Sequence, residues 1–107
     1  MGSSLLVVLG IVLASTPAAA DRELCTPGAK YRGATLDLDV KDADIKDVFR
    51  LLADVGKVNL VVPDDVSGRV TLRLKRVPWD QVACTVAAVH KLTITVQGAI
   101  LMIARRR

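Results

Sequence analysis

Residues 42–82, DADIKDVFRLLADVGKVNLVVPDDVSGRVTLRLKRVPWDQV, contain the periodicities that decide the fold. In the first third of this stretch, apolar residues recur every three or four positions, which is typical of a helix with one buried face. These residues are Ile45, Val48, Phe49, Leu52 and Val55. Asp42 or Asp44 is suited to cap the N-terminus of this helix, where a carboxylate is favourable. Gly56 predicts a left-handed C-cap at the other end.

Two strands are expected after this helix. Residues 58–62 are almost entirely apolar, which indicates a strand buried on both faces. Residues 63–68 contain the Pro, Asp, Ser and Gly typical of a connection. Apolar and polar residues alternate over 69–75, which predicts a strand with one face in solvent. Its inward residues are Val70, Leu72 and Leu74, and its solvent-facing residues are Arg69, Thr71, Arg73 and Lys75.

The flanking residues complete a chain of alternating elements. Residues 34–40 alternate as a strand with one wet face. Pro78 suits the first position of a second helix, which we expect to run to about Lys91. Residues 92–96 and 99–103 read as strands joined by the two-residue loop Gln97-Gly98. The order βαββαββ predicts an α+β fold, with two helices packed between small sheets that bury their apolar faces.

The N-terminal residues have the pattern of an export signal. Residues 5–14 form an apolar run of about the length of a signal-peptide core, although no Lys or Arg precedes it. Such a run is too short to span a bilayer as a helix. The small residues 18–20 provide a cleavage site. We therefore predict a signal peptide over 1–20 and a mature chain that begins at Asp21 and has no transmembrane span.

The charge of the mature chain is modestly basic. All 15 Lys and Arg and all 11 Asp and Glu lie beyond Ala20, which leaves a net charge of +4. Acidic residues are interleaved with the basic ones, and an exported protein rarely meets DNA. These two facts argue against nucleic-acid binding.

Several short motifs resemble the short N-terminal domain shared by bacterial secretins and TonB-dependent transporters, and are closest to the copy in type IV pilus secretins. The motifs are Asp44-Ile45, LLAD at 51–54, NLVV at 59–62, VSG at 66–68, VTLRL at 70–74 and VPWDQ at 77–81. The resemblance covers residues 34–103. It implies a domain over 34–107 in which a two-stranded and a three-stranded sheet enclose two helices. It also implies a periplasmic docking module without a catalytic role.

Three features depart from the family pattern. The family usually has Gly where this chain has Lys57, which implies a remodelled helix C-cap. Position 84 is usually polar and here is Cys84. A secretin continues into further periplasmic domains and a pore-forming domain, whereas this sequence runs to Arg107. Of the functions of the family, we therefore expect docking and not transport.

The chain has two cysteines, Cys25 and Cys84. At about 100° per residue, Cys84 lies opposite the apolar stripe of the second helix and is expected to face outward. Cys25 lies in the polar lead-in, residues 21–33, which we expect to be extended or loop. In an oxidising compartment, these positions favour a disulfide that ties the lead-in across the second helix. Two free thiols and an intermolecular bridge are the alternatives.

The remaining candidates for chemistry have structural explanations. His90 is the only histidine, and its position at a helix C-terminus is favourable to the helix dipole. Ser67 fits turn chemistry, and Asp37 and Asp39 fit the wet face of an edge strand. Residues 105–107 are three arginines that either contact an acidic surface or are simply solvated. We predict no catalytic, cofactor-binding or metal-binding residue.

The sequence thus leads to three hypotheses. The first is an exported, non-enzymatic interaction module that docks to an envelope secretin or a pilus or secretion component, with Arg69, Arg73 and Lys75 as the contact face. It would be periplasmic and associated with the outer membrane through its partner. The second is a signalling module that contacts an anti-sigma regulator. The third is a small hydrolase or redox enzyme, which is disfavoured because the sequence has no nucleophile–base pair or CxxC. The oligomeric state is not predicted.

Overall fold

The structure of the chain, a computed structural model, describes residues 22–106. The predicted signal peptide over 1–20, together with Asp21 and Arg107, lies outside the described residues.

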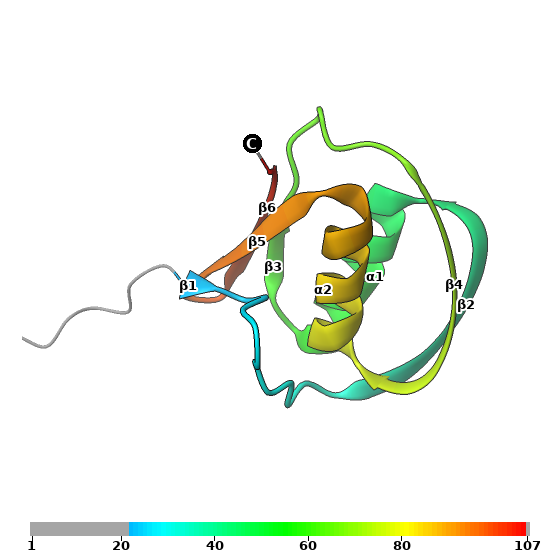
Figure 1. The fold of residues 1–107 in the computed structure, drawn as a ribbon, viewed down its shortest axis with the longest axis horizontal. Helices are drawn as coiled ribbons and strands as arrows, with labels where there is room; N and C mark the ends of the chain where they lie inside the picture. The colour runs from blue at the N-terminus through cyan, green and yellow to red at the C-terminus, as the bar shows by residue number, and fades with distance from the viewer. Residues whose placement is uncertain (1–21, 107) are drawn as a thin grey trace, which may run out of the picture.

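Two helices lie between two small sheets (Figure 1). One sheet has the strand order β1 (Arg22–Glu23), β5 (Leu92–Gln97), β6 (Ile100–Arg105) and β3 (Asn59–Val61). The other pairs β2 (Thr35–Asp44) with β4 (Arg69–Pro78) in antiparallel register. The helices are α1 (Ile45–Gly56) and α2 (Trp79–His90). The predicted α+β fold is confirmed, and the short strand β1 extends the predicted three-stranded sheet by one strand.

The core fills the space between the two sheets. The predicted apolar face of α1 is buried except for Val55, which is half-buried, and Phe49 and Leu52 are fully inaccessible. From α2, Val82, Ala83 and Val86 pack into the same cluster. The sheets close it with alternate residues of their strands, because successive side chains of a strand point to opposite faces. These residues are Leu38, Val70, Leu92, Ile94, Leu101 and Ile103.

The ends of α1 differ from the prediction in one respect. Asp44 is the N-cap, and its carboxylate accepts a hydrogen bond from the Lys46 N–H at 2.8 Å. The prediction that Gly56 forms the left-handed C-cap is wrong, because Lys57 adopts that conformation with φ 56°. Gly56 is needed for a different reason. A Cβ at Gly56 would lie 2.4 Å from the ring of Trp79, so only glycine permits this close approach.

Trp79 is in fact held between two glycines. A Cβ at Gly33 would lie 2.3 Å from its indole nitrogen, on the lead-in side of the ring. The backbone N–H of Trp79 donates to the Ala34 carbonyl at 2.9 Å. Pro78 keeps an extended ψ of 141° and serves as the N-cap, so it is not the first helical residue as predicted. Trp79 therefore joins α1, α2 and the start of β2.

Two further strand predictions need correction. Strand β3 is not buried on both faces, because Asn59 and Val61 are exposed, Val61 to 51%; it lies at the edge of its sheet. The hairpin between β5 and β6 turns at Gly98 and Ala99, with Gly98 at φ 59°, and Gln97 still belongs to β5. The observed turn is thus one residue later than the predicted one.

The lead-in is held to the domain at several points. Strand β1 pairs with β5 in the register Arg22 to Val96, and the Leu24 N–H donates to the Ile94 carbonyl at 3.0 Å. Farther along, the Gly33 N–H donates to the buried carboxylate of Asp80 at 3.3 Å.

Within residues 22–106, neither helix has the length and apolar character needed to cross a membrane.

Candidate docking surface

The β2–β4 sheet has one face in solvent and two open edges among the described residues. Its inner face covers the helices, and its outer face is exposed to solvent. Among the described residues, neither β2 nor β4 has a second strand beside it. Both edges therefore offer unpaired N–H and C=O groups to another chain.

Side chains fix two irregularities in this sheet. The Asp37 carboxylate accepts a hydrogen bond from the Arg76 N–H at 2.8 Å, where Arg76 has φ 54°. At the second irregularity, the Asp42 N–H donates to the Thr71 hydroxyl at 3.0 Å. The Arg69 guanidinium donates to the Asp42 carbonyl at 3.2 Å. Such bulges bend the strand locally. Asp37 thus has a structural role on the exposed face.

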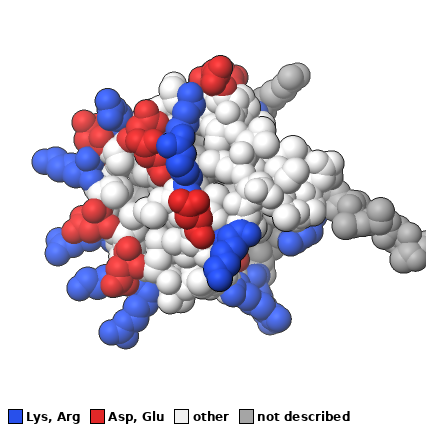
Figure 2. All heavy atoms as spheres, turned by 180° about the vertical axis from the view of Figure 1, so that it is seen from behind, with Lys and Arg blue, Asp and Glu red and all other residues white. Residues whose placement is uncertain are grey.

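The three predicted contact residues lie along β4 and are all exposed. Arg69 is opposite Asp44, and Arg73 is opposite Asp39 in the register of the two strands. On this side of the molecule, which lies at the left in Figure 2, basic and acidic side chains alternate. The surface is therefore mixed in charge. Because the side chain of Arg69 already supports the bulge, Arg73 and Lys75 are the more available pair.

The structure joins Cys25 and Cys84 in a disulfide, with their Cα atoms 5.4 Å apart. Gln81, Thr85 and Ala88, which are neighbours of Cys84 on the same side of α2, are exposed. Its neighbours Asp80 and Ala87 are buried, so Cys84 lies at the border between the two faces of α2, and the prediction that it faces outward is wrong because it is only 7% exposed. The disulfide places Cys25 of the lead-in against it.

The other single residues of interest do not come together. Ser67 is exposed in the connection between β3 and β4. His90 is the last residue of α2, and its imidazole lies against Gly68, where a Cβ would be 3.1 Å from Nδ1. Within residues 22–106, no group of three His, Cys, Asp or Glu side chains is placed to hold a metal ion.

One cavity was not predicted from the sequence. It has a volume of about 650 Å³ and is lined by three segments: Pro63 and Asp65, His90 and Lys91, and residues 104–106. These segments are distant in sequence and meet only in the fold. The one sequence signal for this site is the arginine run at 105–107, for which contact with an acidic surface was one of the two explanations.

No protein-family model matches the chain. PilQ of Neisseria gonorrhoeae, a type IV pilus biogenesis and competence protein, is 39% identical over 77 residues, which are 72% of this chain and 11% of PilQ. The solved structure of the Vibrio cholerae type IV competence pilus secretin PilQ is 40% identical, with a TM-score of 0.58. That match covers 64% of this chain and 16% of the other.

The N0 domain of the type II secretin from enterotoxigenic Escherichia coli has the same fold, with a TM-score of 0.61 over 95% of that chain and 67% of this one. Their sequence identity is 16%, so this likeness concerns the fold alone. The chain carries a secretin N-terminal domain. The predicted resemblance to type IV pilus secretins is therefore confirmed. The chain spans about a tenth of the length of the PilQ relatives, at 11% and 10% for those of N. gonorrhoeae and Pseudomonas aeruginosa.

Proposed function

We propose that this secretin domain is a non-enzymatic docking module that binds a secretin or another component of a type IV pilus or secretion assembly. The observation that carries the proposal is the 39% identity to PilQ over 77 residues. The match between the described fold and secretin domains of known structure supports it.

The β2–β4 sheet provides a physical route to docking. Its open edges permit strand addition, in which main-chain hydrogen bonds supply affinity and side chains supply specificity. The alternating charges around Arg73 favour a partner with the complementary pattern, because charge complementarity steers encounter and rejects wrong partners. Packing of a whole partner domain against the same face is the second route.

The proposal places the domain in the periplasm and, through its partner, at the outer membrane. Residues 1–20 act as the export signal, as their composition predicts. The Cys25–Cys84 disulfide supports this location, because disulfides persist in oxidising compartments such as the periplasm.

A double variant on β4, Arg73→Gln with Lys75→Gln, is expected to weaken capture of the partner by about tenfold, because complementary charges at an interface rim govern association. Both side chains are exposed, so stability should change by less than about 0.5 kcal/mol per site. The measurement is quantitative mass spectrometry of envelope proteins retained by the tagged, exported chain.

The matched control removes two charges elsewhere, with Lys30→Gln and Arg32→Gln in the exposed lead-in. The control should capture as much partner as the unmodified chain. Equal capture by a stably folded β4 variant would exclude this face as the contact. If the unmodified chain retains no secretin or pilus protein, the docking function itself is rejected.

A further inference from the structure

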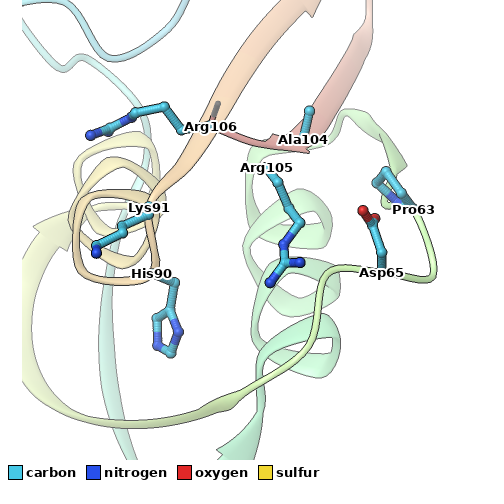
Figure 3. Close-up of a pocket in the computed structure, with 7 residues that line it drawn as sticks. All are labelled: Pro63, Asp65, His90, Lys91, Ala104, Arg105 and Arg106. Atoms are coloured by element: carbon cyan, nitrogen blue, oxygen red, sulfur yellow. The ribbon is translucent and has the colours of Figure 1, made fainter.

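A basic cavity lies at the end of the domain where α2 finishes. Its walls are the C-terminal end of α2, the connection between β3 and β4, and the end of β6. The volume of about 650 Å³ is within the range of ligand pockets. Figure 3 shows Arg105 extending into the cavity between His90 and Asp65, with Lys91 and Arg106 on the side of α2.

The cavity has an excess of positive charge. Three cationic side chains, Lys91, Arg105 and Arg106, line it together with one carboxylate, that of Asp65. With His90 neutral, this is an excess of two positive charges in a chain whose net charge is +4. Among residues 22–106, the single ion pair within 4.0 Å joins Arg50 to Asp47, so the cavity cations lack a carboxylate partner there.

Backbone hydrogen bonds bring together the segments that carry these cations. The Arg106 N–H donates to the Lys91 carbonyl at 2.9 Å, which ties the end of β6 to the C-cap of α2. Lys91 itself is fixed in the left-handed conformation, with its N–H bonded to the Ala87 carbonyl. The His90 imidazole packs against Gly68 of the connection between β3 and β4. The partial negative charge at the C-terminus of α2, equivalent to about half a charge, is smaller than the local excess.

We propose that this basic pocket binds the carboxylates of an acidic peptide segment. Arg105 and Arg106 present planar guanidinium groups, which match a carboxylate through paired hydrogen bonds. Several carboxylates in one segment match the excess of positive charge in the pocket, and phosphate, which the same cations attract, serves as a comparison ligand in the test. The inference rests on the proposed docking function in one respect, namely that the peptide segment belongs to a partner protein.

The test is an NMR titration of the oxidised, exported chain with an acetylated tetraglutamate peptide. Amide shifts should centre on residues 90–91 and 104–106 and should shrink as salt is added, because salt screens exposed charges. The Arg105→Gln and Arg106→Gln double variant should bind at least about tenfold more weakly, because it loses the charge-assisted hydrogen bonds. The Lys30→Gln and Arg32→Gln control should change affinity by less than about twofold, since both side chains lie outside the cavity.

Three comparison probes are used in parallel: a tetraglutamine peptide, inorganic phosphate and phosphatidylglycerol vesicles. Stronger binding of tetraglutamate than of any of them, at these amides, supports the proposal. The proposal is overturned if shifts fall elsewhere, if both double variants lose affinity equally, or if phosphate or vesicles bind the site more tightly. If the chain captures envelope proteins but does not bind the peptide, only the proposal for the pocket is rejected. If the chain binds the peptide but captures no envelope protein, only the docking function is rejected.

Discussion

Reduction of the Cys25–Cys84 disulfide is expected to lower the free energy of unfolding by about 4 kcal/mol, because the bond closes a loop with a sequence separation of 59. In the chain-entropy account, the cross-link stabilises the fold by restricting the unfolded chain. A loss of this size is a large part of the stability of a small domain. The melting temperature should fall on the order of 20 °C for a domain of this size. Thermal and urea unfolding of oxidised and reduced protein provide the measurement.

A double Cys25→Ser and Cys84→Ser variant serves as the matched control, because it removes the bond without a reductant. It should melt with the reduced protein and keep the same circular dichroism spectrum, since the core cluster is unchanged. Thiol counting on unreduced, denatured protein from the envelope should find no alkylatable thiol. Two free thiols, or a covalent dimer that reduction dissolves, would contradict the intramolecular bond.

Gly56→Ala is expected to destabilise the domain by about 1–3 kcal/mol, as overpacking of a filled core does. The new Cβ would meet the Trp79 ring at 2.4 Å, so the ring or the helix must shift. Inside a helix, alanine is otherwise better than glycine by about 1 kcal/mol. The sign of the effect should therefore reverse when the ring is removed. In a Trp79→Leu background, the same substitution should stabilise the domain by up to about 1 kcal/mol.

A double-mutant cycle measures this coupling directly. The four proteins are unfolded in urea and followed by far-ultraviolet circular dichroism, because the chain has a single tryptophan and the two proteins with Trp79→Leu lack it. A coupling energy of about 2 kcal/mol or more between positions 56 and 79 is expected for residues in such close contact. If Gly56→Ala costs the same in both backgrounds, the contact with the ring does not explain the glycine.

Local patterns predicted the elements and the helix faces. The stripe from Ile45 to Leu52 is buried as its spacing predicts, because helical periodicity and burial have the same physical origin. Gly56 shows where this reasoning stops. A glycine at the end of a helix is explained equally well by a left-handed cap or by a tight contact. Only the position of Trp79 in the fold shows that the contact is the reason here. The same limit applies to β3, whose apolar run does not reveal that it is an edge strand.

The candidate sites depended even more on tertiary structure. The alternation over 69–75 correctly placed Arg69, Arg73 and Lys75 on the exposed face of β4. It did not reveal that Arg69 supports a bulge, because that bond spans 27 residues. The basic pocket was missed for the same reason. Its three segments form one basic pocket only in the folded chain, where the Arg106 N–H is bonded to the end of α2.

The central claim, docking to an envelope assembly, is tested most directly by photo-crosslinking in living cells. A photoreactive amino acid replaces Arg73 on the exposed face of β4, and cross-linked partners are identified by mass spectrometry. The same substitution at Lys30, in the exposed lead-in, provides the control. The account predicts a cross-link from position 73 to a secretin or another pilus or secretion component, and little or none from position 30. Cross-links from position 73 to unrelated proteins alone, in cells where the domain is folded and exported, would contradict it.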